Sequence, residues 1–349
     1  MDPIINTFAS EFGDITYITL CNSSGANVTL SSLGAGIVSI NVPDSTGILD
    51  DVALGYAEAE SYFNDGPTMG KIPGRYANRI KFGKFRLDNT DYQLPINLPP
   101  HTLHGGFEAG IHNKIWDIDT CSGDTVTFRL VSPDGDAGFP GELKLKATYH
   151  WSEYNSLALN IEAETDKPTI VNFTSHAYLK LKGLKGGTAL DHILQLNCDF
   201  FLETDSTLVP TGRLLKVEGT PMDFREPKAV GRDMAEGYEP LRFAKGYDHC
   251  FVINNYCIGK VRSLGKIYEP STGRIVEILT DQPAAQLYTA NWMDGAPAGK
   301  SGYIYQDYDG IAIEPQDYPD APNNPGFPST RLNPGERYSR NIIFRFITR

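Results

Sequence analysis

Residues 169–181, TIVNFTSHAYLKL, place a histidine in a segment whose side chains alternate in character. In an extended strand, successive side chains point to opposite faces, so His176 shares a face with Asn172, Thr174 and Tyr178. A polar, aromatic face that carries a histidine suits the floor of a wet cleft. The solvated face of a sheet fits the same pattern.

Glu314 is a second candidate for proton chemistry. It follows the apolar triplet IAI at 311–313 and precedes Pro315, which holds Glu314 extended and tends to end a strand. A carboxylate at a strand end can point into the mouth of a cleft, where burial and neighbouring groups tune its pKa. An ordinary surface glutamate fits this local pattern equally well.

Two motifs could supply further polar groups. LHGG at 103–106 sets His104 beside two glycines that let backbone approach a ligand closely, although a tight turn with an exposed histidine also fits. GRYANRI at 74–80 brings arginine and asparagine together, and these offer forked donors for hydroxyls or a developing oxyanion. An arginine that pairs with acidic residues is the structural alternative for this motif.

The motif GYDH at 246–249 sets Asp248 beside His249. On a strand these neighbours point to opposite faces, so only one of them is expected to reach a common site. HExxH, EF-hand, GxSxG and GxGxxG motifs are absent from the sequence, which argues against metal, serine-hydrolase and dinucleotide sites. One histidine, one glutamate and supporting polar residues suit proton transfer on a neutral polar substrate.

The elements that must position these residues are predicted to be strands. Period-two patterns separated by turn residues cover residues 125–131, 141–150, 157–165 and 194–200. Short helical turns fit only 56–63 and 228–238. The proline-rich segment 314–328 lies between two strand patterns and is interpreted as a long ordered loop. We therefore expect an all-β sandwich or barrel that forms a single domain over residues 1–349.

Composition restricts the partners. Asp and Glu outnumber Lys and Arg by 43 to 31, which gives a formal net charge of −12. Nucleic acid, polyanionic substrates and anionic membrane surfaces are bound mainly through basic residues, so the charge argues against all three. No run of 18 apolar residues suggests a membrane span, and the N-terminus does not resemble a signal peptide. We expect a cytoplasmic enzyme.

The cysteines do not resemble a disulfide framework or a zinc site. They number five, they are widely spaced, and no CxxC motif occurs. Cys198 falls in an alternating strand pattern and Cys250 precedes an apolar run, so both are expected to be buried free thiols.

Seven motifs in order resemble the aldose 1-epimerase (galactose mutarotase) family: GRYANRI at 74–80, LHGG at 103–106, TSHAYLKL at 174–181, LVPTG at 208–212, GYDH at 246–249, QLYTANW at 286–292 and IEPQDYPDAPNNPGFP at 313–328. The resemblance implies a large antiparallel β-sandwich with an open sugar-binding cleft. It also implies interconversion of the α and β anomers of free aldohexoses such as galactose and glucose, without a metal or organic cofactor.

The resemblance assigns roles residue by residue. Glu314 corresponds to the general base and His176 to the general acid. Tyr178 or Trp292 could stack on the sugar ring. The positions that correspond to sugar contacts in the family are Asn78, Arg79, His104, Tyr178, Asp248 and Gln286.

Two departures from the family pattern affect the expected cleft. The family commonly reads TNHSYFNL where this chain reads TSHAYLKL, and by alternation Lys180 would place a charge near the cleft. The final motif often begins LETQ rather than IEPQ, so Pro315 stiffens the residue after the expected base.

Three alternatives remain open from the sequence. A hexose-6-phosphate 1-epimerase would need a cluster of Arg or Lys for the phosphate. A non-catalytic sugar-binding protein could keep the cleft without turnover. A glycoside hydrolase would need two carboxylates, for which the best pair is Glu314 with Asp248. The expected partner is a small monosaccharide, and the chain is expected to be a monomer or a homodimer.

Overall fold

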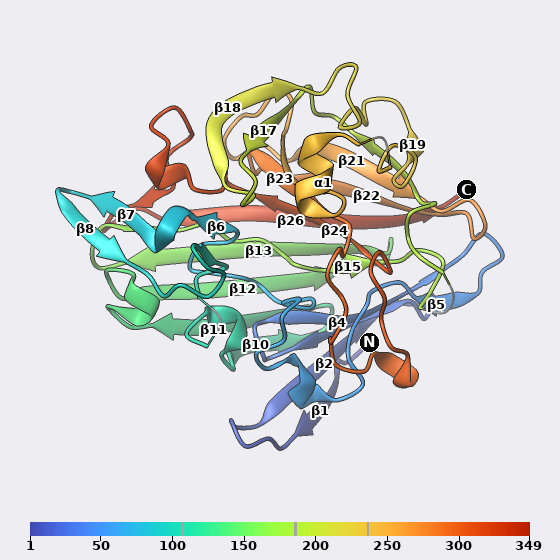
Figure 1. The fold of residues 1–349 in the computed structure, drawn as a ribbon. Coiled ribbons are helices and arrows are strands. Elements are labelled where there is room, and N and C mark those ends of the chain that lie inside the picture. Colours follow the sequence, from blue (N-terminus) through green and yellow to red (C-terminus); the bar gives the residue numbers. More distant parts are fainter. Residues whose placement is uncertain (107, 185–186, 236) are drawn as a thin grey trace.

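The computed structural model describes residues 1–106, 108–184, 187–235 and 237–349. Its largest element is an antiparallel nine-stranded sheet whose long strands cross the middle of the molecule (Figure 1). From edge to edge the sheet contains β10 (Asp117–Ser122), β11 (Thr125–Ser132), β12 (Leu143–Trp151), β13 (Ser156–Thr165), β26 (Tyr338–Thr348), β22 (Arg274–Thr280), β21 (Arg262–Tyr268), β16 (Ile193–Leu196) and β19 (Lys228–Ala229).

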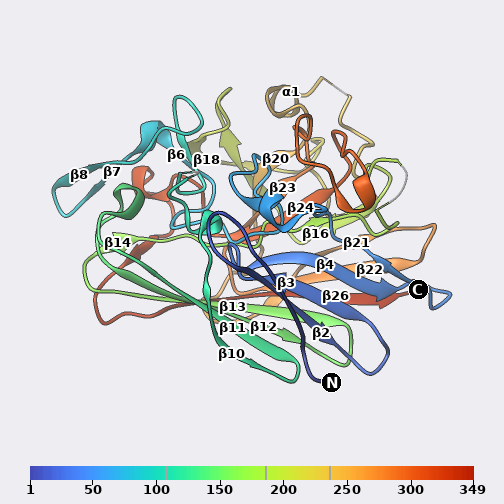
Figure 2. The same cartoon turned by 90° about the horizontal axis from the view of Figure 1, so that it is seen from below.

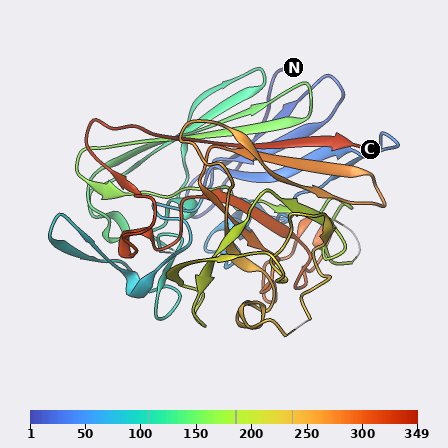
Figure 3. The same cartoon turned by 90° about the horizontal axis from the view of Figure 1, so that it is seen from above.

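A six-stranded antiparallel sheet forms a second layer against the first, and the two layers are seen from above in Figure 3. It contains, in spatial order, β15 (Tyr178–Leu179), β24 (Ile311–Gln316), β23 (Ala284–Tyr288), β20 (Asp248–Val252), β17 (Phe200–Thr204) and β18 (Pro210–Lys216). This sheet carries Tyr178, Asp248, Tyr288 and Glu314 of the candidate site.

A five-stranded sheet lies beside the long strands, as the view from below shows (Figure 2). It contains β1 (Ile4–Phe8), β2 (Ile15–Cys21), β3 (Asn27–Ser31), β4 (Gly36–Pro43) and β5 (Leu49–Asp51). Three two-stranded pairs complete the strands: β6 (Arg79–Ile80) with β9 (Thr102–Leu103), β7 (Lys84–Leu87) with β8 (Thr90–Gln93), and β14 (Thr169–Ile170) with β25 (Arg331–Leu332).

Alternation explains how the sheets pack. In β12, Leu143, Leu145 and Ala147 are buried while Lys144 and Lys146 between them are exposed. One continuous apolar cluster joins Val28 of the five-stranded sheet to residues of both larger sheets. Burial of this apolar surface is the main favourable term in folding. The predicted antiparallel β-sandwich is therefore confirmed, and the patterns at 125–131, 141–150 and 157–165 correspond to β11, β12 and β13.

The predicted strand at 194–200 is wrong as a single element. Residues 193–196 form β16 in the nine-stranded sheet, and residues 200–204 form β17 in the six-stranded sheet. Between them the Asn197 amide donates to the Leu264 carbonyl, and the Asp199 amide donates to the Asn254 side chain. The chain changes sheet at this point although Leu194, Leu196 and Cys198 are alternately buried up to it, so the sequence pattern does not reveal the break.

Helical structure is sparse within the described ranges. The predicted turn at 56–63 contains η1 (Ala59–Tyr62), whereas the described residues of 228–238 form β19 followed by turns. The α-helix α1 (Glu239–Ala244) begins just after that segment, with proline near its start. The other short 3₁₀ helices are η2 (Lys81–Gly83), η3 (Ile111–Asn113), η4 (Asp136–Gly138), η5 (Lys300–Gly302) and η6 (Ala321–Asn323). Within the described part of the chain, no helix has the length and apolar character needed to cross a membrane.

Candidate active site

One face of the six-stranded sheet forms the floor of the candidate site. Cross-strand pairing aligns Tyr178 with Ala312, Ala312 with Tyr288, and Tyr288 with Asp248. Residues that pair directly in an antiparallel sheet share a face, and so do residues two apart along a strand. Glu314 therefore lies on the same face as this row, where it pairs with Gln286.

The opposite face of the same strands packs into the core. Ile311 and Ile313 alternate with Ala312 and Glu314, and both isoleucines belong to the main apolar cluster. The triplet before Glu314 thus anchors the strand while the carboxylate points to the cleft. Pro315 does not end the strand, because β24 continues to Gln316. At Pro315 the strand pairs with β23 on one side only, because β15 on the other side pairs with Ile311 and Ala312. Proline, which has no N–H to donate, is tolerated at such an edge position.

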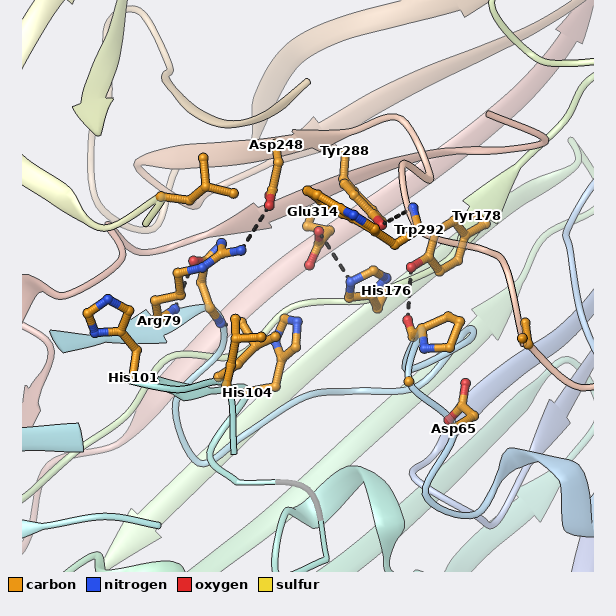
Figure 4. A pocket seen from close by; sticks show the side chains of 18 of the residues that line it. Asp65, Arg79, His101, His104, His176, Tyr178, Asp248, Tyr288, Trp292 and Glu314 are labelled. Atoms are coloured by element: carbon orange, nitrogen blue, oxygen red, sulfur yellow. Dashed lines mark hydrogen bonds and ion pairs between the residues drawn. The ribbon is translucent and has the colours of Figure 1, made fainter. Parts of the chain in front are cut away.

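Glu314 and His176 meet in the middle of the cleft. The Nε2 atom of His176 lies 3.5 Å from Oε1 of Glu314, and the side chains are only 5% and 2% exposed (Figure 4). The cavity above them has a volume of about 740 Å³. A buried acid–base pair that opens into a cavity of this size is a site for proton transfer on a bound small molecule.

Burial shifts both groups of this pair toward their neutral forms. Desolvation, together with the nearby Asp248 carboxylate, holds the pKa of Glu314 well above its ordinary range, although Arg79 opposes the shift. Desolvation lowers the pKa of His176 to about 4. Between these values the pair carries one proton, which leaves one group able to donate and the other able to accept.

Arg79 and Asp248 form a second buried pair beside the first. Nη2 of Arg79 donates to Oδ2 of Asp248 at 3.0 Å (Figure 4). The amide of Gln286 donates to the other oxygen, Oδ1, at 2.6 Å. Burial raises the pKa of Asp248, but Arg79 and Gln286 outweigh it and hold that pKa below its ordinary value. Asp248 is thus a carboxylate with fixed orientation.

His104 is held as a neutral ring with a known tautomer. Its Nδ1 atom accepts a hydrogen bond from the Asn78 amide at 3.1 Å, while its own amide donates to the Asn78 carbonyl at 3.0 Å. Burial first, and then His176, lower the pKa of His104 well below its usual value. Because Nδ1 accepts, the ring proton is on Nε2. His104 can therefore act as a hydrogen-bond donor without being charged.

Polar atoms without partners gather around this cavity. Among the described residues that line it, Glu314 has a buried Oε2 and Arg79 a buried Nε without a hydrogen-bond partner. Buried polar groups are normally satisfied, and each unsatisfied one costs free energy. A ligand rich in hydroxyl groups could supply the missing partners.

The structure brings together seven of the eight residues predicted for the site. They line the cavity: Asn78, Arg79, His104, His176, Tyr178, Asp248 and Glu314. Gln286 does not line the cavity and instead donates to Asp248 from the neighbouring strand β23. His249, the neighbour of Asp248, points into the core near Phe201, as alternation predicts.

The expected position of Lys180 is wrong. Its ammonium group lies outside the cavity lining, 3.4 Å from Asp309 and over the ring of Tyr303. The alternation argument assumed one continuous strand over 169–181, but the structure forms only β14 and β15 at its two ends. All residues of this segment are buried, so it is not a solvated sheet face either.

Arg75 has a structural role, but its buried guanidinium bonds to a serine hydroxyl and to carbonyl groups rather than to the acidic residues that the structural alternative predicted. It donates to carbonyl oxygens of residues 132–133 and 140–141 rather than to the cleft. The proline-rich loop after Glu314 packs behind the same motif, where the Tyr76 hydroxyl donates to the carbonyl of Tyr318. Cys198 and Cys250 are buried free thiols, as predicted.

Several cavity-lining residues escaped the sequence analysis, among them Tyr288, Asp65 and His101. Tyr288 lies two residues after Gln286 and on the same strand face, so alternation could have found it. Asp65 and His101 lie on loops, where no pattern identifies them. Trp292, suggested as a stacking residue, does line the cavity and is 44% exposed.

Comparisons with known proteins agree with this geometry. A sequence model of the family described as aldose 1-epimerase matches residues 16–345. The chain belongs to the aldose 1-epimerase family. It is 39% identical to a galactose mutarotase of Rattus norvegicus over 93% of this chain and 92% of that protein. Members of this family are isomerases that act on carbohydrates, and so is this chain.

Solved structures show the same fold. A GalM/aldose epimerase homologue from C. elegans superposes with a TM-score of 0.87 at 31% identity, covering 95% of this chain and 98% of that one. A galactose 1-epimerase from Lactobacillus acidophilus superposes with a TM-score of 0.84 at 27% identity, covering 99% of each chain. The enzyme therefore has the fold of galactose mutarotases, as the motifs predict.

Proposed function

We propose that this enzyme interconverts the α and β anomers of free aldohexoses, galactose and glucose among them, with Glu314 as general base and His176 as general acid. The observation that carries the proposal is the buried Glu314–His176 pair, with 3.5 Å between Oε1 and Nε2, at the centre of the cavity. Mutarotation needs one proton removed and one supplied on neighbouring oxygens of the sugar, and this pair can do both.

The proposed reaction balances its protons within the pair. The Glu314 carboxylate takes the proton of the C1 hydroxyl as the C1–O1 bond becomes a carbonyl. The C1–O5 bond breaks, and the His176 imidazolium gives its proton to O5. Rotation about C1–C2 presents the other carbonyl face. Ring closure then reverses both transfers and restores the starting protonation state.

The pair carries one proton in either of two forms. In the neutral form the proton is on Glu314, and in the charged form it is on His176. Sugar hydroxyls that donate to Glu314, together with the nearby Arg79, would favour the carboxylate and leave the proton on His176. Nε2–H of His104 and the guanidinium of Arg79 would stabilise charge that develops on oxygen. Asp248 would accept hydrogen bonds from the ring hydroxyls.

The charges of the cavity favour a neutral sugar over a hexose 6-phosphate. Among the described residues that line it, Arg79 is the one Arg or Lys, and Asp248 already pairs with it. Asp294 also lines the cavity, and Asp65, which lines it too, is already paired with the buried Lys71. A phosphate would therefore lack the cluster of cations that it requires.

Polarimetry of freshly dissolved α-D-galactose and α-D-glucose tests the proposal. Glu314→Gln and His176→Asn should each reduce kcat by about 10²–10⁴-fold, because each removes one proton-transfer partner. Exposed counterparts, Glu218→Gln and His150→Asn, should keep wild-type rates. Near wild-type turnover by a folded Glu314 or His176 variant would refute the assignment, and failure of the wild-type protein with both sugars would refute the activity.

We also propose that the chain is one domain over residues 1–349 and acts in the cytoplasm as a monomer or homodimer. The apolar cluster shared by the three large sheets supports one domain. The free thiols of Cys198 and Cys250 suit a reducing compartment. One cooperative unfolding transition, cell fractionation and sedimentation velocity would test these three points.

A further inference from the structure

The backbone of His176 is held by a loop rather than by a sheet. β15 begins only at Tyr178, so no strand ladder fixes residue 176. Instead, the Gly70 amide donates to the His176 carbonyl at 3.0 Å, and the His176 amide donates to the Lys71 carbonyl at 3.0 Å. The position of the imidazole therefore depends on the segment 65–71.

This segment is wedged between His176 and the five-stranded sheet. The Ile37 amide donates to the Gly70 carbonyl at 2.8 Å. A Cβ atom at Gly70, where φ is +70°, would lie 2.0 Å from the Ile37 carbonyl oxygen, so only glycine fits. On the other side, the Tyr178 hydroxyl donates to the Pro67 carbonyl at 2.9 Å.

A buried ion pair closes the segment on itself. Nζ of Lys71 lies 2.5 Å from Oδ1 of Asp65, and both side chains are at most 1% exposed. Lys71 also donates to Oδ1 of Asn113, while Oδ2 of Asp65 accepts from the Tyr56 hydroxyl and the Met69 amide. These contacts lock the wall of the cavity that Asp65 and Pro67 form.

We propose that the buried Asp65–Lys71 pair is a positioning element for His176: it holds the histidine backbone opposite Glu314 and presents no net charge to the imidazole. The inference rests on the proposed role of His176. Asp65 raises the pKa of His176 and Lys71 lowers it, so the two effects oppose each other in the intact pair. Removal of either partner leaves a single charge in a weakly screened interior.

The substitutions of this pair leave the other titratable groups near His176 chemically unchanged. They are Glu314, Asp248, His104, His112, Tyr178 and Tyr288. The acid limb of the pH–rate profile marks the gain of a second proton by the Glu314–His176 pair. A charge left by Asp65 or Lys71 should therefore displace this limb in a direction that its sign determines.

The test uses Asp65→Asn, Lys71→Met and the double variant. The acid limb of kcat/KM for galactose should move to higher pH by about one unit in Lys71→Met and to lower pH in Asp65→Asn. It should return close to the wild-type position in the double variant, which again has no net charge. NMR titration of the His176 ring should show the same order, and kcat of Lys71→Met should fall about tenfold or more as the ring is displaced.

Lys228→Met is the matched control, because it also breaks a buried pair, Lys228–Asp233 with 2.6 Å between Nζ and Oδ2, outside this cavity. It should lower stability without moving the acid limb.

Shifts of the acid limb in the same direction in Asp65→Asn and Lys71→Met, or no shift in either, would overturn the inference. If Lys71→Met does not fold, Asp65→Asn and the double variant still decide. If His176→Asn stays active, the proposed function fails instead, and the NMR titration alone judges the positioning role.

Discussion

At the scale of single residues, the cavity is a set of charges that tune one another. Asp248 sits between Arg79 and Gln286 and also raises the pKa of Glu314. The alkaline limb of the pH–rate profile should report the loss of the last proton from the Glu314–His176 pair, which Glu314 governs. Under the proposed mechanism, Asp248 should therefore act on Glu314 through its charge as well as through its proposed contact with the sugar.

Asp248→Asn should move the alkaline limb to lower pH by about one unit, because loss of the nearby negative charge makes Glu314 easier to ionise. The measurement is the rate of galactose mutarotation against pH, with the uncatalysed rate subtracted at each pH. Asp294→Asn, which also changes a carboxylate that lines the cavity, is the control and should leave the limb in place. An alkaline limb that stays in place or rises in Asp248→Asn would contradict the coupling.

At the scale of elements, short irregular segments do as much positioning as the strands. His104 follows the two-residue strand β9 and is anchored to Asn78 just before β6. The turn after it passes directly over the Gly74 backbone. A Cβ atom at Gly105 would lie 2.3 Å from the Gly74 carbonyl oxygen. The glycine in this motif serves backbone packing that orients a cavity residue.

Gly105→Ala should displace His104 and lower both stability and activity. The clash and the φ of +78° together should cost about 2–5 kcal/mol in unfolding free energy. Gly106→Ala is the matched control, since it also has positive φ, +90°, but its nearest neighbour would be a Pro95 side-chain atom at 3.6 Å. Urea unfolding measures the loss of stability and polarimetry the loss of activity in both variants. The difference between the two variants reports the clash, because both share the strain of a positive φ. Equal losses in the two variants would disprove the packing argument.

At the scale of the whole molecule, buried neutral histidines tie stability to pH. Burial lowers the pKa of His176, His192 and His249 to about 4 each. Nε2 of His192 accepts a hydrogen bond from the Leu181 amide at 2.9 Å. Protonation of Nε2 would replace this bond with a repulsive contact between two N–H donors. An unfolded histidine titrates near 6.5 and binds more protons than the folded one, so stability falls as pH drops from about 6.5 to 4.

His192→Gln should flatten this dependence. The wild-type protein should lose about 2–4 kcal/mol from His192 alone between pH 6.5 and 4, and the variant should not lose that share. Asp317 acts in the opposite direction. Burial raises its pKa to about 6, so the stability that its protonated form contributes at low pH is lost as pH rises. Thermal melts of wild type, His192→Gln and the exposed control His150→Gln across this range test the prediction. Parallel curves for wild type and His192→Gln would rule out His192 as the source.

Local sequence pattern determined the strand class of the chain and the direction of several side chains. Alternation predicted β11, β12 and β13, and it separated Asp248 from His249 correctly. The resemblance of seven motifs identified seven of the residues that line the cavity. These features could be read from the sequence because strand alternation is a local property of the backbone.

Only the tertiary structure decided the rest. It broke the patterns at 169–181 and 194–200, placed Lys180 outside the cavity lining and set Gln286 beside Asp248 instead of in that lining. It also brought Asp65 and Lys71 against His176 from more than one hundred residues away in the chain. Such contacts depend on which sheet each segment joins and on how the sheets pack. A segment that is buried on both faces also loses the alternation of polar and apolar residues by which a strand is recognised in a sequence.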